Sequence, residues 1–122
     1  MGRFIITIPP VSIARELWRL GEADLASRAL KLSAEEALDI GRRAGALYQS
    51  GEAREIWPDG PSGVYSAVAL AAVEYLEGSA RPCARSRRLP EKSLPPELQV
   101  SEADRWAALT PLTEVEPRRM HE

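Results

Sequence analysis

The sequence predicts a mostly α-helical protein: a small bundle of about four helices with a short N-terminal extended arm and a Pro-rich C-terminal extension. Three observations support this fold class. Apolar residues recur at helical spacing between residues 12 and 78, capping residues or glycines bound these stretches, and prolines become frequent after residue 80. The 122 residues suffice for one hydrophobic core and are too few for two independent ones.

The N-terminal arm comprises residues 4–8, Phe-Ile-Ile-Thr-Ile, and is followed by Pro9 and Pro10. Its β-branched side chains are typical of a short strand or an extended segment. No second segment of comparable β propensity is visible in the sequence. We therefore expect the arm to pack on the chain's own helices; the alternative is that it pairs with a strand of another chain.

The first two helices are expected over residues 13–20 and 22–31. Ser12 is the candidate N-cap of the first helix, and Gly21 follows its last apolar residue. Acidic residues in the first turn of the second helix favour its N-terminus because they interact well with the helix dipole. The short connection at Gly21 predicts that the two helices form an antiparallel or crossed pair.

A third helix is expected from residue 34 to about residue 49. Ser33 and Glu36 have the spacing of a capping box, in which each side chain accepts a hydrogen bond from the other residue's backbone, and Gly51 provides the C-terminal stop. Gly41 and Gly45 lie within this helix, where each costs about 1 kcal/mol relative to alanine. Their small size on the apolar face predicts the close approach of a neighbouring helix.

The fourth helix is expected from residue 62 or 63 to about residue 77. It follows a turn-rich connection containing Pro58-Asp59-Gly60-Pro61, before which Trp57 is expected to fill the edge of the core. Residues 64–73 are apolar on nearly every face of this helix, which predicts that it is central and buried.

The sequence divides into a helical domain over residues 1–80 and a basic, Pro-rich extension over residues 81–122. One short helix is expected in the extension, over residues 102–109, where Ser101 caps the segment and Trp106 and Leu109 share one face. An isolated helix of this length is marginal in water. We therefore expect it to form only when docked, either on a partner or on the chain's own domain.

Composition excludes several classes of function. A net charge of −2 gives no general attraction to phosphate backbones or anionic membranes. The single cysteine, Cys83, excludes a disulfide-stapled secreted scaffold, and the apolar run of the arm is too short for a signal peptide. No apolar stretch approaches the roughly 20 residues of a membrane span. A protein of the reducing cytoplasm, without a membrane segment, is expected.

The sequence contains no convincing catalytic, metal-binding or cofactor-binding motif. His121 is the sole histidine and lies next to the C-terminus, so no histidine-based triad or multi-histidine metal site can be assembled. Cys83 is interpreted as an incidental thiol rather than a nucleophile, although neighbouring arginines could activate it. Gly60-Pro61-Ser62-Gly63 is interpreted as the start of a helix rather than a phosphate cradle, because the chain lacks a Gly-x-x-x-x-Gly-Lys pattern.

The charge pattern after residue 80 leaves two interpretations of the arginine cluster between Arg81 and Arg88. In the first interpretation, which we favour, the cluster is part of a solvated linker or docks on an acidic protein. In the second, it forms a phosphate-binding surface. With Trp106 and Leu109 as apolar anchors, the favoured interpretation predicts a non-enzymatic protein-interaction module. The residues expected to contact the partner are Arg85, Arg87, Arg88, Leu94, Leu98, Trp106 and Leu109.

The partner is expected to be another protein, such as a toxin or an enzyme, or a second copy of the chain. Bacterial antitoxins and immunity proteins are often built as a folded part plus an extension that wraps a partner, although this is only an analogy of architecture. The alternative function is a DNA-binding transcriptional regulator, with a helix-turn-helix formed by residues 22–31 and 34–49. Glu35, Glu36 and Asp39 disfavour it, because they would repel the DNA backbone. A small enzyme using carboxylates or Cys83 has the least support.

Overall fold

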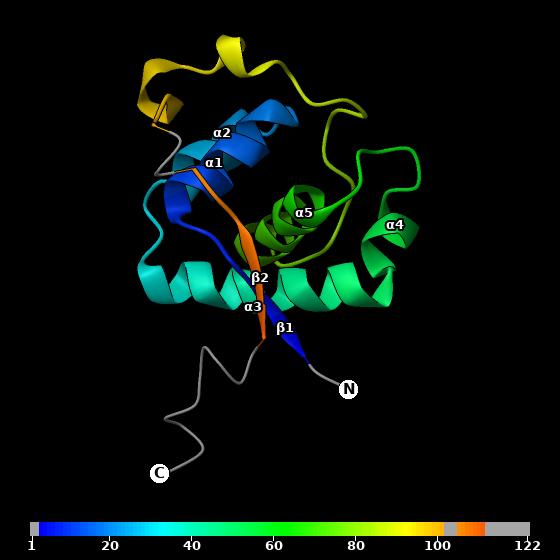
Figure 1. Cartoon of the computed structure of the whole chain (residues 1–122). Helices are drawn as coiled ribbons and strands as arrows, with labels where there is room; N and C mark the ends of the chain where they lie inside the picture. Colours follow the sequence, from blue (N-terminus) through cyan, green and yellow to red (C-terminus); the bar gives the residue numbers. More distant parts are fainter. Residues whose placement is uncertain (1–2, 102–104, 112–122) are drawn as a thin grey trace.

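The computed structural model describes residues 3–101 and 105–111 and confirms that the protein is mostly helical (Figure 1). Five α-helices and a two-stranded sheet are found in these residues. None of these helices is long and apolar enough to cross a membrane. The elements are β1 (Phe4–Thr7), α1 (Pro10–Arg19), α2 (Ala23–Ala29), α3 (Ala34–Ser50), α4 (Glu52–Ile56), α5 (Val64–Glu77), 3-10 turns at Glu91–Ser93 and Pro96–Leu98, and β2 (Ala108–Pro111).

Helix α5 occupies the centre of the molecule, as its uniformly apolar sequence predicts. All residues from Ser66 to Val73 are buried, and α5 packs against α3 and α1. Trp57, at the start of the connection between α4 and α5, is also part of the core. Helix α1 begins earlier than expected, at Pro10, because proline is well tolerated at the first helical position, where its missing N–H has no partner to lose.

Helix α3 has the predicted ends. The backbone N–H of Glu36 donates to the Ser33 hydroxyl at 3.1 Å, and the N–H of Ser33 donates to the Glu36 carboxylate at 3.0 Å. Gly51 ends the helix in the left-handed conformation, with φ of 79°. The chain then forms the short helix α4, which the sequence analysis did not predict.

Gly41 and Gly45 do admit a close neighbour, but the neighbour is a strand and not the expected helix. A Cβ atom at Gly41 would lie 2.0 Å from the carbonyl oxygen of Ile6, and one at Gly45 would lie 2.2 Å from that of Phe4. The backbone of β1 therefore rests on the surface that the two glycines leave open. The prediction was wrong because small residues on a helix face allow any backbone to approach, whether helical or extended.

The prediction of a short helix over residues 102–109 was wrong for the residues described there. Residues 105–107 are not helical, and Ala108–Pro111 form β2, which pairs antiparallel with β1; residues 102–104 lie outside the described residues. The hydrogen bonds that β1 needs outweigh the weak preference of a two-turn helix. The N-terminal arm thus packs on α3, as expected, and in addition pairs with the chain's own extension.

The described part of the extension shares the core of the helical domain. Cys83, Leu94 and Leu98 are buried in the same cluster as the residues of α1 and α5. In Figure 1 the chain after α5 passes along α1 and α2 before it reaches β2. Among the described residues, the boundary expected near residue 80 therefore coincides with no break in the core.

Candidate interaction site

The sheet has one edge that is closed by α3. The carbonyl oxygens of Phe4 and Ile6 point at the glycines of α3, and the N–H of Phe4 donates to the Gln49 side-chain oxygen at 3.0 Å. In an antiparallel strand, the N–H and C=O groups of one residue point to the same side, and successive residues alternate. Phe4 and Ile6 therefore direct their backbone groups to α3, and no further strand can add to this side of β1.

The opposite edge of the sheet is formed by β2. Since Phe4 and Ile6 face α3, the backbone groups of Ile5 and Thr7 face β2, where the register places Thr110 and Ala108 opposite them. The N–H and C=O of Leu109, between these two residues, then point away from β1. Among the described elements, β1 is the only one against which β2 packs extensively. We call this row of outward backbone groups the open edge.

Two large apolar side chains lie exposed at and just before the open edge. Trp106 is 41% exposed and Leu109 is 40% exposed. Sequence reasoning picked out both residues, but for the wrong geometric reason, since their three-residue spacing does not place them on one helix face when the segment is not helical. What the two residues share is their position in the segment that enters and forms the edge strand.

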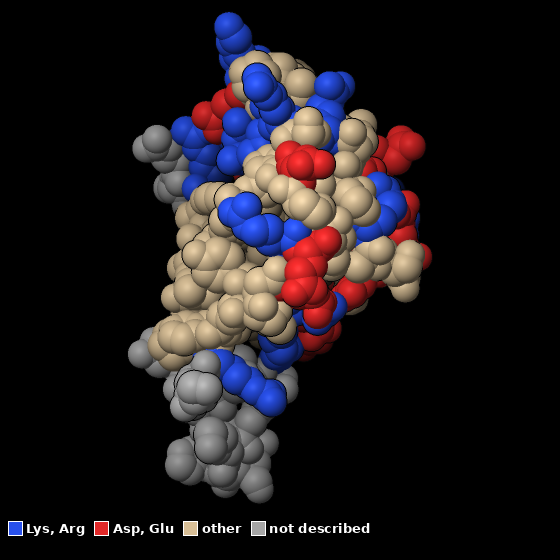
Figure 2. All heavy atoms as spheres, turned by 90° about the vertical axis from the view of Figure 1, so that its right-hand side faces the viewer, with Lys and Arg blue, Asp and Glu red and all other residues tan. Residues whose placement is uncertain are grey.

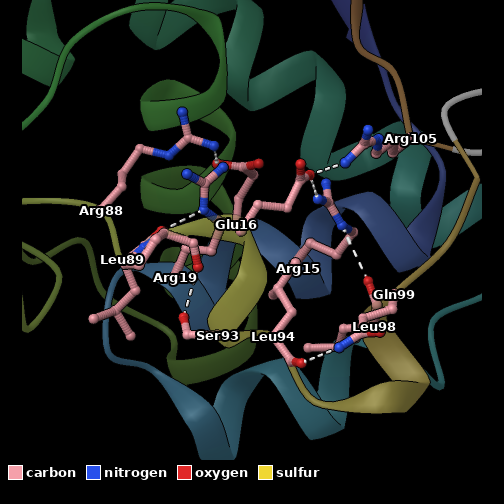
Figure 3. Close-up of polar contacts among 12 residues, drawn as sticks. Arg15, Glu16, Arg19, Arg88, Leu89, Ser93, Leu94, Leu98, Gln99 and Arg105 are labelled. Carbon is pink, nitrogen blue, oxygen red and sulfur yellow. Dashed lines mark hydrogen bonds and ion pairs between the residues drawn. The ribbon is translucent and has the colours of Figure 1, made fainter.

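The first part of the extension is fastened to α1 by a set of arginine contacts (Figure 3). Arg15 is only 4% exposed, donates from Nε to the Leu98 carbonyl at 3.1 Å, and forms an ion pair with Glu91. Arg19 donates to the Leu89 carbonyl at 2.7 Å, while the Leu89 N–H donates back to the Arg19 carbonyl at 2.8 Å. Residues 89–98 are thereby held to one side of α1.

Arg88 belongs to the same set of contacts and pairs with the buried Glu16 of α1. Burial raises the pKa of Glu16, and the positive charges of Arg88, Arg19 and Arg15 oppose this effect. The Arg88 guanidinium also lies 5.6 Å from the centre of the Tyr65 ring, within the range of a cation–π contact. Its charge and its planar face therefore both serve contacts within the chain.

Arg81 is likewise bound within the chain. Its guanidinium donates two hydrogen bonds to the Glu22 carboxylate, at 2.7 and 2.9 Å, and the Ala84 N–H donates a third at 3.0 Å. The hydrogen bonds from Arg81 are the main reason that the pKa of Glu22 lies below its ordinary value. A further ion pair joins Arg81 to Glu77 at 2.6 Å.

The arginine cluster is therefore divided between two environments. Arg81 and Arg88 attach the extension to the helices, whereas Arg85 and Arg87 are exposed. This arrangement gives no support to the DNA-binding alternative, because two of the cations that would grip phosphate already neutralise carboxylates. Sequence reasoning missed Glu16 as a partner, although it lies on the apolar face of its helix, three residues after Ile13, where a charge needs a counter-ion.

Leu94, Leu98 and Cys83 are enclosed in the core. Leu94 and Leu98 are 3% and 2% exposed, so neither leucine is an exposed anchor in this conformation. Burial of the Cys83 thiol raises its pKa to about 12, which leaves almost no reactive thiolate at neutral pH. In the part of the chain that the structure describes, no group of three or more potential ligands could hold a metal ion.

Comparison of the chain with protein-family models, with curated proteins and with solved structures gave no match. The functional argument therefore depends on the chain's own geometry.

Proposed function

We propose that this chain is a non-enzymatic protein-interaction module that binds an extended segment of a partner protein at the open edge of β2. The observation that carries the proposal is the asymmetry of the sheet. One edge is closed by the backbone contact of β1 with α3, while the other presents the N–H and C=O of Leu109. Such an edge is a template for strand addition.

Backbone hydrogen bonds and apolar contacts both contribute to this proposed binding. The open edge offers few backbone groups, and each protein hydrogen bond contributes only about 1 kcal/mol net. The exposed part of Trp106 corresponds to roughly 100 Å² of surface, which contributes about 2.5 kcal/mol when covered. The partner segment is therefore expected to carry apolar side chains that cover Trp106 and Leu109.

The specific form that we propose is a neutralising protein of the antitoxin or immunity type. In this form the C-terminal extension, which carries Trp106 and Leu109, covers a functional surface of the partner. The arginine contacts of residues 81–98 support it, because they hold the extension in a fixed position from which β2 is presented. Once the partner is identified, its activity is measured with and without the chain, and this form of the proposal predicts that the chain inhibits it.

A pair of proline variants tests strand addition directly. Leu109→Pro removes the outward N–H and leaves the pairing with β1 intact, because proline is tolerated at an edge position whose N–H faces solvent. Thr110→Pro removes an N–H that faces β1 and should disrupt the sheet. Leu109→Ala is the matched control, since it shortens the same side chain and keeps the donor.

The variants are compared as affinity baits in an extract of the native host, and each captured protein is then purified for binding measurements. We expect a protein that binds the wild-type chain and Leu109→Ala, and that Leu109→Pro binds at least about tenfold more weakly. Proteins retained equally by wild type and Leu109→Pro, or no retained protein, would contradict the proposal. If the wild-type chain forms a dimer and Leu109→Pro abolishes it, the partner that binds the open edge is a second copy of the chain and not a different protein.

A further inference from the structure

A cavity of about 290 Å³ lies between the end of α3, the short helix α4 and the start of α5. Its volume is close to the lower limit of small-molecule pockets, roughly 300 Å³. The lining divides into an apolar part and a polar part. Leu47, Trp57 and Leu70 contribute the apolar part, and Tyr48, Arg54 and Ser66 are prominent in the polar part.

The N-terminus of α5 forms part of the cavity wall. Its N-cap is Gly63, with φ of 111°, and no side chain caps the helix. The N–H groups of Val64, Tyr65 and Ser66 consequently have no hydrogen-bond acceptor among the described residues. The aligned peptide dipoles of this 14-residue helix add positive potential at the same end.

Ser66 gives a second and independent indication of a ligand. The residue is only 4% exposed, and it lines the cavity together with Leu70, one helical turn further on. The Ser66 oxygen is not one of the fully enclosed side-chain atoms that lack a hydrogen bond, which among the described residues are Glu16 Oε1 and Arg88 Nε. The hydroxyl can therefore be reached from the cavity, where it can donate a hydrogen bond to a bound molecule.

Arg54 supplies the charge at the rim of the cavity. It is exposed on α4 and forms no ion pair with a described residue, in contrast to Arg43 nearby in sequence, which pairs with Glu52 and Glu74. The lining contains no aspartate or glutamate. Figure 2, which views the molecule from the side of α4 in Figure 1, shows a broad uncharged area on this face, with charged side chains gathered mainly above it and on one side.

From these observations we propose that the cavity binds a small molecule that carries one anionic group, a carboxylate or a phosphate, on a short apolar body. The backbone N–H and the hydroxyl of Ser66, in the first turn of α5, hold the anionic group together with the Arg54 guanidinium. The apolar body lies against Leu47, Trp57 and Leu70. Gly60 keeps this wall in place, because a Cβ there would lie 1.9 Å from the Trp57 indole.

The test uses the full chain and four probes: benzoate, phenyl phosphate, inorganic phosphate and the uncharged benzyl alcohol. Binding is followed by the NMR shifts of the Val64, Tyr65 and Ser66 amides. We expect saturable shifts with benzoate or phenyl phosphate, and the stronger of the two identifies the anionic group. Weaker binding of both inorganic phosphate and benzyl alcohol is expected, since each lacks one half of the proposed ligand.

Substitutions locate the binding. Arg54→Gln should weaken the stronger probe at least about tenfold, and Ser66→Ala should weaken it about fivefold, because each removes one donor to a charged group. Arg87→Gln is the matched control, an exposed arginine outside the cavity, and should change binding less than about twofold. Absence of saturable shifts would overturn the proposal, as would equal binding of benzyl alcohol or equal effects of Arg54→Gln and Arg87→Gln.

Discussion

The contact between α3 and β1 makes an unusual prediction for Gly41→Ala. Alanine is the better helix former by about 1 kcal/mol, so helix propensity alone predicts a more stable protein. The structure predicts the opposite sign. The new Cβ would lie 2.0 Å from the carbonyl oxygen of Ile6, at least about 1 Å inside a normal contact.

The size of the destabilisation depends on which group must move to make room for the new Cβ. The Ile6 carbonyl belongs to the backbone of a strand held between α3 and β2, so it cannot turn away as a flexible side chain would. Overpacking of this kind costs about 1–3 kcal/mol, and a rigid backbone neighbour places the cost at the upper end. After the gain in helix propensity, we expect a net loss of about 2 kcal/mol in the free energy of unfolding.

Thermal and urea unfolding monitored by circular dichroism measure this loss. For a chain of this size, 2 kcal/mol corresponds to a fall in Tm of roughly 6–10 °C. The control is Ala46→Gly, at an exposed position of the same helix, which should destabilise by about 1 kcal/mol through propensity alone. Gly41→Ala and Ala46→Gly are opposite exchanges, yet both should destabilise the protein. An increase in Tm for Gly41→Ala would refute the close contact of α3 with β1.

Three further predictions concern the extension. Glu22→Gln should destabilise the protein by roughly 1–2 kcal/mol at pH 7, because it weakens the charged hydrogen bonds from Arg81. The pKa of Glu22 lies below its ordinary value in the folded protein, so this stabilisation is present above the ordinary pKa and is lost as the pH falls through the lowered pKa. Urea titrations should therefore show the variant approaching wild type on acidification below the ordinary carboxyl pKa. Cys83 should react with a thiol reagent much more slowly in the native protein than in urea, and rapid native labelling would show that the extension is not packed as described. Trp106→Ala should weaken partner binding at least about tenfold while lowering Tm less than Gly41→Ala does; the reverse pattern would place Trp106 in the core.

Local signals in the sequence predicted four of the five helices found in the described residues. The reciprocal hydrogen bonds of Ser33 and Glu36, the stop at Gly51 and the uniformly apolar stretch after Gly63 each depend on residues that are close in sequence. Such signals determine where a helix begins, where it ends and which of its faces is buried. They were sufficient for the mostly helical fold class and for the central position of α5.

The strand pairing could not be predicted because its two halves are about a hundred residues apart and only one has a strong β pattern. Ala108–Pro111 has little intrinsic preference for a strand, and it forms β2 because Ile5 and Thr7 present unpaired backbone groups beside it. The positions of Gly41 and Gly45 indicated a close neighbour but not its type. All four apolar residues of the extension that the sequence suggested as partner contacts looked alike in sequence, but Trp106 and Leu109 are exposed, whereas Leu94 and Leu98 are buried.

Amide hydrogen exchange at Ala108, Leu109 and Thr110 tests the central claim, that β2 presents an open edge to a partner strand, most directly. In the free chain we predict slow exchange at Ala108 and Thr110, whose N–H groups face β1, and fast exchange at Leu109, whose N–H points away from β1. In the complex with the partner, the Leu109 amide should become protected. Protection of Leu109 in the free chain, or fast exchange at Leu109 in the complex, would contradict strand addition at this edge.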